Sequence, residues 1–277
     1  MDKLFPQPAA GQADLIGGTG MYTYPKYDLK GKVAVVTGAG QGLGKWIALA
    51  LADAGADVLV AALHSETAEK TCSEIREMGR KSTFLAVDVS DAEAVKAMMA
   101  AAEADLGGLD ILVNNAGVNI HKAALDFTPE DFARIVDVNA KGVFFCSQAA
   151  AARMIPKGAG RIINIASSVA FLVRAGIPNS IYAMTKAGVV MLTKALAEEW
   201  SRFNINVNAI APGYFLTPLV EDRFKDSEMY NTIVSSTPLG RAGNPEDVMG
   251  VAVFLASAAS AYITGQTICV DGGRTIL

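Results

Sequence analysis

The chain has few of the residues that build metal centres and disulfide frameworks. Its 277 residues include three Cys and two His. His64 and His121 are far apart in the sequence, and neither has Cys or carboxylate partners at ligand spacing. We therefore expect no metal. The cysteines, Cys72, Cys146 and Cys269, are odd in number and widely spaced, so we expect reduced thiols rather than disulfides.

An excess of positive charge and long apolar runs are also lacking. The 24 Lys and Arg against 28 Asp and Glu give a net charge of −4, without the basic surface that nucleic acid binding requires. Apolar stretches such as Val143–Ala152 are too short to cross a bilayer, and the first residues have no signal-peptide pattern. We expect a cytoplasmic protein with a small-molecule partner, and no nucleic acid or membrane partner.

What the chain does have is a regular alternation of short apolar runs and helical segments. With 51% hydrophobic residues, it can bury the core of one large α/β domain. The alternation predicts a doubly wound, seven-stranded parallel sheet with helices on both faces and a site at the carboxyl ends of the strands. The strands are expected at about 32–37, 57–62, 82–87, 109–113, 160–166, 205–210 and 266–270.

A glycine-rich loop follows the first of these strands. The apolar run Lys32–Thr37 leads directly into Gly38-Ala-Gly-Gln-Gly-Leu-Gly44 and then into a helical pattern. Glycines let backbone N–H groups approach a phosphate closely, and the helix that follows offers its positive end to the anion. The spacing is Thr37-Gly38-x-x-x-Gly42-x-Gly44 and not the usual G-x-G-x-x-G. It predicts a site for the pyrophosphate of a dinucleotide.

A tyrosine and a lysine one helical turn apart carry the chemistry. Tyr182 and Lys186 share a helix face, so the ammonium lies close to the phenol and favours its ionised form. A free Tyr titrates near pH ~10, too high for a base. We expect Lys186, together with an oxidised nicotinamide, to lower the pKa of Tyr182 towards working pH, where the phenol exchanges a proton with a substrate oxygen.

Taken together, these motifs resemble the short-chain dehydrogenase/reductase family over residues 29–276. The resemblance implies a single-domain Rossmann-type fold and hydride transfer between a nicotinamide and a secondary alcohol or ketone. It also implies a catalytic set of Asn139, Ser167, Tyr182 and Lys186, in which Asn139 holds a water linked to the lysine. The implied cofactor-binding residues are Thr37, Gly38, Gln41, Gly42, Leu43, Gly44, His64, Asp88, Val89, Asn115, Ala116, Gly117, Tyr182, Lys186, Pro212, Gly213, Phe215 and Thr217.

The catalytic serine departs from the family pattern. The family's usual serine lies thirteen residues before the tyrosine, and Val169 occupies that position here. Alignment of the preceding strand instead favours Ser167, which requires two extra residues in the loop at Phe171–Pro178. Ser168 stays open as the alternative, because a local shift of the strand end would present its hydroxyl instead.

The residues at the end of the second strand give conflicting indications of whether the cofactor is NAD or NADP. An acidic residue there would bind the ribose 2′-OH and repel a 2′-phosphate, but Ala62 and Leu63 occupy that place. Neither Gln41 nor positions 62–65 supply the Arg or Lys that a 2′-phosphate attracts, which leaves His64, Ser65 and a helix N-terminus. On balance the sequence favours NAD over NADP.

The substrate class rests on a narrower resemblance. The segments Glu199–Tyr214, Val143–Ala149 and Phe254–Tyr262 resemble the branch of the family that contains gluconate 5-dehydrogenase and 2-dehydro-3-deoxy-D-gluconate 5-dehydrogenase. That implies a sugar acid or a polyol. Candidate cations for a carboxylate are His121, Lys122, Arg174 and Arg223. The alternatives are a carbonyl or ketoacyl reductase that takes a hydrophobic or carrier-bound ketone, and a non-catalytic cofactor-binding regulator.

The remaining predictions concern the organisation of the chain. Residues 1–28 lie outside the resemblance and are expected to form an N-terminal extension, either flexible or in contact with another subunit. Residues 29–277 form the dehydrogenase domain, with a substrate lid at about 214–238. The resemblance also implies a homotetramer, in which helices around 129–155 and 181–202 pair across one interface and residues 268–277 lie near another.

Overall fold

The computed structural model describes residues 26–173, 178–217 and 227–276. Within these residues the strands are β1 (Val33–Thr37), β2 (Asp57–Ala62), β3 (Ser82–Ala86), β4 (Ile111–Asn114), β5 (Gly160–Ile165), β6 (Ile205–Pro212) and β7 (Thr267–Val270). They form one sheet in the order β3-β2-β1-β4-β5-β6-β7, and every neighbouring pair is parallel. The predicted seven-stranded parallel sheet is confirmed.

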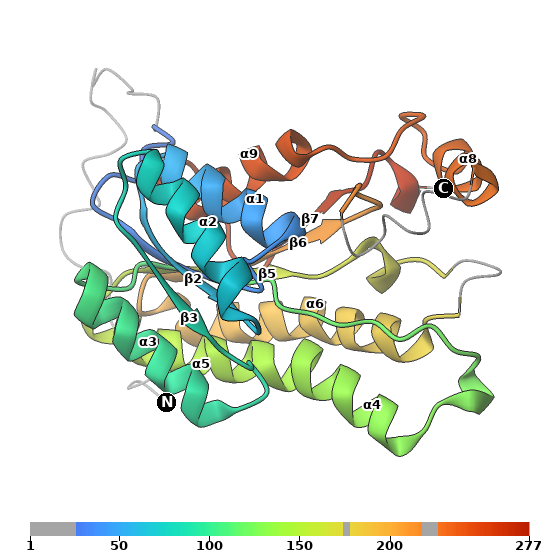
Figure 1. Cartoon of the computed structure of the whole chain (residues 1–277), viewed down its shortest axis with the longest axis horizontal. Helices are drawn as coiled ribbons and strands as arrows, with labels where there is room; N and C mark the ends of the chain where they lie inside the picture. The colour runs from blue at the N-terminus through green and yellow to red at the C-terminus, as the bar shows by residue number, and fades with distance from the viewer. Residues whose placement is uncertain (1–25, 174–177, 218–226, 277) are drawn as a thin grey trace, which may run out of the picture.

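Helices cover both faces of the sheet, as the doubly wound prediction required (Figure 1). One layer consists of α1 (Gly42–Asp53), α2 (Ser65–Glu77) and α9 (Pro245–Ala256), and the other of α3 (Ala92–Leu106), α5 (Val143–Met154) and α6 (Ser180–Ser201). Successive strand residues face opposite layers: Val36 packs with the first and Val35 with the second. Because both faces are buried, the central strands are apolar runs rather than alternating ones.

The sheet order places a switch point beside β1. From β1 the chain winds outward through β2 to β3, and it then returns to β4 on the opposite side of β1. Neighbouring crossovers therefore leave in opposite directions, which opens a crevice at the carboxyl ends of β1 and β4. The fold thus places the glycine loop and the end of β4 on the same edge of the sheet.

The long helix that the sequence predicted over 129–155 contains an irregular turn. It begins with α4 (Pro129–Val136), continues as a π-helix over Asp137–Gly142 and becomes α5 without a break. Thr128 starts it with a capping box, in which its hydroxyl accepts from the N–H of Asp131 and the Asp131 carboxylate accepts from the N–H of Thr128. π-turns within α-helices occur frequently at functional sites. The other predicted helix, 181–202, corresponds to α6.

Shorter elements complete the described chain. Helix α8 (Ser227–Ser235) lies near the carboxyl end of the chain (Figure 1). Residues 1–25 of the predicted extension, 174–177 of the predicted enlarged loop and 218–226 of the predicted lid lie outside the described residues. Short 3₁₀ turns occur at Ala124–Asp126, Ile155–Lys157, Ser168–Ala170, Ala258–Ser260 and Arg274–Ile276.

Three features of the described residues bear on the expectations about cysteines, metals and membranes. The three cysteines are free thiols, with Cys72 and Cys146 buried and Cys269 exposed. In this part of the chain, His, Cys, Asp and Glu do not gather in groups of three or more that could hold a metal ion. Among its helices, none combines the length and the apolar character that crossing a bilayer demands.

Candidate active site

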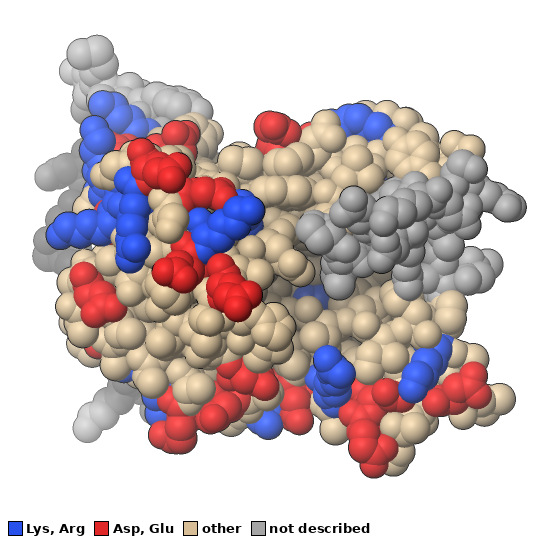
Figure 2. All heavy atoms as spheres, in the orientation of Figure 1, with Lys and Arg blue, Asp and Glu red and all other residues tan. Residues whose placement is uncertain are grey.

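A cavity of about 770 Å³ opens at the carboxyl ends of the strands. In the space-filling view it is a hollow near the centre of the molecule (Figure 2). Most of the predicted site residues line it, from loops that follow different strands and from the start of α6. These residues are Gly38, Gln41, Gly42, Leu43, His64, Asp88, Val89, Asn115, Ala116, Gly117, Ser167, Tyr182, Lys186, Pro212, Gly213, Phe215 and Thr217. Thr37, Gly44 and Asn139 are absent from the lining and lie behind it.

The glycine loop leaves no room for side chains where it faces its neighbours. A Cβ on Gly40 would lie 2.3 Å from the Thr67 hydroxyl, and one on Gly44 would lie 2.4 Å from the carbonyl oxygen of Gly38. Gly38 and Gly42 have φ of 63° and 56°, in the left-handed region that favours glycine. The loop therefore presents bare backbone to the cavity just before α1 begins. This cradle fits the pyrophosphate of a dinucleotide.

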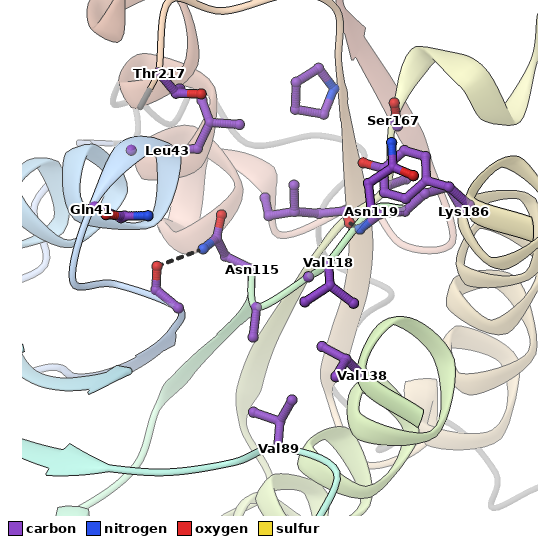
Figure 3. Close-up of a pocket in the computed structure, with 18 of the residues that line it drawn as sticks. Gln41, Leu43, Val89, Asn115, Val118, Asn119, Val138, Ser167, Lys186 and Thr217 are labelled. Carbon is purple, nitrogen blue, oxygen red and sulfur yellow. Dashed lines mark hydrogen bonds between the residues drawn. The ribbon is translucent and has the colours of Figure 1, made fainter. Parts of the chain in front are cut away.

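Two polar side chains fix the glycine loop to the end of β4. The Thr37 hydroxyl accepts hydrogen bonds from the backbone N–H groups of Asn115 (3.0 Å) and Ala116 (3.1 Å). In return, the Asn115 side-chain amide donates to the carbonyl oxygens of Thr37 (2.9 Å) and Gly38 (3.1 Å). Figure 3 shows Asn115 reaching towards this loop. Thr37 therefore holds the loop from behind instead of forming part of the cavity wall.

The ends of β2 and β3 shape the part of the cavity that the adenosine half of a dinucleotide would occupy. His64 is exposed and precedes the first residue of α2, and Thr67 in the first turn of α2 donates to the His64 carbonyl oxygen at 2.9 Å. Asp88 is exposed, and its carboxylate accepts from the N–H (2.9 Å) and the hydroxyl (2.7 Å) of Ser90. Both His64 and Asp88 line the cavity.

Tyr182 and Lys186 meet at the inner end of the cavity. They lie one turn apart in α6, with the Lys186 Nζ 5.7 Å from the centre of the Tyr182 ring. Lys186 is only 3% exposed, and its Nζ donates to the Ile165 carbonyl oxygen at 2.7 Å. Figure 3 shows Lys186 close to Ser167, which follows the end of β5. The structure thus brings together the tyrosine, the lysine and the serine that the sequence singled out.

Burial dominates the pKa of the tyrosine in the protein without a nicotinamide. Removal from water raises the pKa of Tyr182 to about 12, a hydrogen bond with Ser167 lowers it, and the neighbouring phenol of Tyr214 raises it further. Burial also lowers the pKa of Lys186 to about 8. The prediction that Lys186 and an oxidised nicotinamide together bring the phenol towards working pH stays a prediction, because these values belong to the protein without a nicotinamide.

Ser167 and Ser168 differ in their surroundings. Both line the cavity, but the hydrogen bond to the Tyr182 phenol belongs to Ser167. The Ser167 hydroxyl also accepts from the N–H of Val169 at 3.3 Å, which fixes it at the start of a 3₁₀ turn. Ser168 is buried, 4% exposed, within that turn. This geometry supports Ser167 over Ser168.

Asn139 lies on the π-helix, fully buried behind the cavity wall. Its side-chain oxygen accepts from the N–H of Val118 at 2.8 Å, and its amide nitrogen donates to the Val118 carbonyl oxygen at 2.8 Å. The amide nitrogen also approaches the Thr185 hydroxyl at 3.3 Å. Asn139 therefore connects the segment after β4 to α6, one residue before Lys186.

The four predicted carboxylate-binding cations differ in their positions and contacts. Lys122 forms an ion pair with Asp131 at 2.5 Å and does not line the cavity. His121 does line it, and both of its ring nitrogens have a polar neighbour. Its Nε2 lies 3.0 Å from the Asn119 amide nitrogen, and its Nδ1 lies 3.3 Å from the Pro178 carbonyl oxygen. Arg174 and Arg223 lie outside the described residues.

Sequence reasoning missed several polar residues of the cavity. Asn119 comes two residues after Gly117, and Tyr214 lies between Gly213 and Phe215. Gly117, Gly213 and Phe215 are predicted cofactor-binding residues, and the nearness of Asn119 and Tyr214 to them in the sequence was the available signal. Arg274 comes from the last turn of the described chain, and its neighbours Gly272 and Gly273 offered only a sign of a turn. Asn179 at the start of α6 was also overlooked.

A parallel sheet with a glycine cradle beside a buried tyrosine–lysine pair defines a nicotinamide-dependent oxidoreductase of the Rossmann type. Comparison with known proteins supports this class. The family model described as enoyl-(acyl carrier protein) reductase matches residues 38–275. A 2-dehydro-3-deoxy-D-gluconate 5-dehydrogenase of Escherichia coli (strain K12) is 44% identical over 248 residues, which cover 89% of this chain and 96% of that protein. The chain belongs to the short-chain dehydrogenase/reductase family.

Two further relatives show the range of the similarity. The crystal structure of a gluconate 5-dehydrogenase from Burkholderia cenocepacia J2315 in complex with NADP and tartrate is 39% identical, with a TM-score of 0.86 and coverage of 91% of this chain and 98% of that one. A 3-oxoacyl-[acyl-carrier-protein] reductase of Staphylococcus aureus (strain Mu50 / ATCC 700699) is 40% identical over 243 residues, 87% of this chain and 97% of that protein. The protein is thus an NAD(P)-dependent oxidoreductase that acts on CH–OH groups.

Proposed function

We propose that the protein interconverts a secondary alcohol and a ketone on a sugar acid. The observation that carries this proposal is the meeting of Ser167, Tyr182 and Lys186 with the glycine cradle on the wall of one cavity. The similarity to enzymes named for gluconate and its keto-deoxy derivative supports the substrate class. Polar side chains around the reacting centre, among them Asn119, Asn179 and His121, suit a substrate with many hydroxyl groups.

In this proposal Tyr182 and Ser167 act directly on the substrate oxygen, and Lys186 and Asn139 support the proton transfer. Oxidation of an alcohol removes a proton from that oxygen, and the Tyr182 Oη takes it; reduction returns it. The Ser167 hydroxyl orients and polarises the same oxygen by hydrogen bonding. The buried ammonium of Lys186 stabilises the phenolate when it forms. Asn139 supports a water path that exchanges the proton with solvent.

The cavity wall supplies the groups that would hold the cofactor. The glycine loop with Gln41 and Leu43 would bind the pyrophosphate, while Asp88, Val89 and His64 would line the adenosine side. The nicotinamide side would be formed by Lys186 and by the loop with Pro212, Gly213, Phe215 and Thr217. A bound nicotinamide supplies the hydride acceptor or donor. The fit rests on the backbone of the loop, where Gly38 and Gly42 have positive φ and Cβ atoms on Gly40 and Gly44 would collide with Thr67 and Gly38.

We propose NAD as the favoured cofactor, with NADP as the form to be tested beside it. No Arg or Lys among the described lining residues comes from the end of β2, where a 2′-phosphate would lie. His64 and Thr67 provide the polar groups of the lining there, and Ser65 is the first residue of α2. The Burkholderia relative binds NADP, so the two cofactors must be compared directly. The ratio of kcat/KM for NAD to kcat/KM for NADP, measured at equal ionic strength, shows which cofactor the enzyme prefers.

We also propose the larger organisation that the family resemblance implies. Residues 29–277 form the catalytic domain with a lid at about 214–238, preceded by the extension 1–28. The assembly is a cytoplasmic homotetramer. Exposed apolar side chains on the outer surfaces of α5 and α6, Phe144, Met184 and Met191, support pairing of these helices between subunits.

The proposal is tested by nicotinamide absorbance with NAD and NADP against aldonates, keto-deoxy sugar acids, polyols, hydrophobic ketones and carrier-bound ketones. We expect sugar acids to give the highest kcat/KM. Tyr182→Phe should bind cofactor normally and lose at least about a hundredfold in turnover, the usual contribution of a general acid–base group. A panel led by hydrophobic or carrier-bound ketones would favour the ketoacyl-reductase alternative. Tight cofactor binding without turnover on any substrate would favour the regulator.

A further inference from the structure

Arg134 lies on the edge of the cavity and has no task in the proposed proton transfer. It belongs to α4 and is exposed to solvent, yet it also lines the cavity, as does Val138 four residues further along. The residue after it, Ile135, is fully buried and anchors this part of α4 in the protein interior. Arg134 therefore extends from a fixed helix to the edge of the cavity.

The order of groups in a nicotinamide dinucleotide indicates which end of the cavity Arg134 occupies. The pyrophosphate joins the two nucleosides, so a cofactor with its nicotinamide beside Tyr182 and its pyrophosphate at the glycine loop extends its adenosine away from Tyr182. Val89 and Val138 mark this far end, and Figure 3 shows both of them away from Ser167. Arg134 is separated from Val138 by about 6 Å of helix length. We therefore place it at the adenosine end.

The helix that carries Arg134 is packed tightly against the segment after β3. A Cβ on Gly142, at the end of the π-helix, would lie 2.9 Å from the Val89 side chain and 3.0 Å from the Val89 carbonyl oxygen. The turn that follows α4 is therefore in direct contact with the end of β3. Asp88, which comes just before Val89, is exposed and lines the cavity. The helix with Arg134 and the segment with Asp88 thus enclose the same end of the cavity.

The guanidinium of Arg134 is not used by the fold. The carboxylates three residues away on either side, Asp131 and Asp137, pair with other cations: Asp131 with Lys122, and Asp137 with Lys141 at 3.1 Å. Within the part of the chain that the structure describes, the guanidinium forms neither a hydrogen bond nor an ion pair. Its planar faces and its donors are therefore open to a ligand in the cavity.

We propose that Arg134 covers the adenine ring of the cofactor, with its guanidinium stacked on the face of the base. This inference rests on the position of the adenosine side given in the proposed function. A guanidinium is planar, delocalised and weakly hydrated, so it stacks on aromatic faces, where the attraction between cation and ring adds to the van der Waals contact. The substrate reacts at the Tyr182 end, so its carboxylate is not the partner of Arg134.

The test measures dissociation constants by titration of reduced-nicotinamide fluorescence, without substrate. The ligands are NADH, NADPH and reduced nicotinamide cytosine dinucleotide, which has the charges of NADH but a base of one ring instead of two. The variants are Arg134→Gln, which removes the charge, and Arg134→Lys, which keeps the charge without the planar guanidinium. Arg202→Gln is the matched control, because it removes the same charge from an exposed arginine that does not line the cavity.

We expect Arg134→Gln to weaken NADH binding by about 3- to 10-fold, the effect of losing a cation–π contact, and to weaken binding of the cytosine dinucleotide less. Arg134→Lys should recover part of the loss, and the control should match the wild type. Equal losses for the two bases, or no loss, would overturn the proposal. A loss confined to NADPH would place Arg134 on the 2′-phosphate and overturn it too. Wild-type enzyme that binds NADH but oxidises no sugar acid would instead refute the proposed function.

Discussion

The buried charge of Lys186 leads to a prediction about stability that is independent of catalysis. Burial lowers the pKa of this lysine from 10.5 to about 8. Below pH 8 the ammonium is protonated in both the folded and the unfolded protein, so the folded state carries the full penalty of a buried charge. As pH rises through 8 towards 10.5, the folded protein loses this proton first, and the penalty is relieved.

The magnitude follows from the size of this change in pKa. At about 1.4 kcal/mol for each pKa unit, the full effect is about 3 kcal/mol. Between pH 7 and pH 9.5, where the unfolded lysine still holds its proton, the free energy of unfolding of the wild type should rise by about 2 kcal/mol relative to a variant without the charge. Lys186→Met is suitable, because methionine keeps an unbranched apolar stem in the same space.

The assay is urea-induced unfolding of both proteins, without cofactor, at pH 7 and pH 9.5. Other groups titrate in both proteins and cancel in the difference. An exposed lysine two turns further along α6, Lys194, provides the control variant Lys194→Met, for which the difference should not change with pH. If the difference for Lys186→Met is also constant within about 0.5 kcal/mol, burial does not lower the lysine pKa, and the same reasoning for Tyr182 fails.

Three further predictions concern the cavity. Ser167→Ala should lower kcat by about 100-fold or more, while Ser168→Ala has a much smaller effect. Steady-state kinetics of the two variants would show which serine is catalytic, and a larger loss in Ser168→Ala would identify Ser168. Gly44→Ala should destabilise the protein by about 1–3 kcal/mol in urea unfolding and weaken cofactor binding, because the added Cβ would lie 2.3 Å from the Asn115 amide nitrogen; an unchanged midpoint would contradict this packing. Burial raises the pKa of Tyr182, and oxidation of an alcohol needs the phenolate, so kcat/KM for alcohol oxidation should rise from pH 7 to pH 9. If chemistry is rate-limiting and kcat/KM does not change with pH, the phenol is not the base.

The sequence predicted the architecture well because the strands are buried on both faces. The predicted range of β2, 57–62, is also the observed one, because the apolar run Val58–Ala62 follows a turn at Gly55 and the polar residue Asp57. The π-helix at 137–142 was not visible, since one extra residue in a helical turn has no distinct pattern in the sequence. Its extra residue shows only in the backbone geometry.

The site was predictable where its residues belong to local motifs and unpredictable where it depends on distant contacts. The spacing of Tyr182 and Lys186 placed them on one helix face, as observed. Spacing carries no information about burial, which raises the pKa of Tyr182 to about 12 in the protein without a nicotinamide. Arg274 is nearly ninety residues from Lys186 in the sequence, and only the fold brings it to the same cavity.

The π-helix between α4 and α5 also constrains how this chain can change in length. Each residue of an α-helix turns the chain by about 100° about the helix axis, and a π-turn holds one residue more than the α-helical turn that it replaces. Removing one residue from 137–142 would therefore restore a regular α-helix and leave Cys146, Ala150 and Met154 of α5 on the face that enters the core. The same deletion would withdraw the Asn139 side chain from Val118, because the wide turn that carries Asn139 would be lost. The loss of one residue here would thus damage the site while it spares the packing of α5.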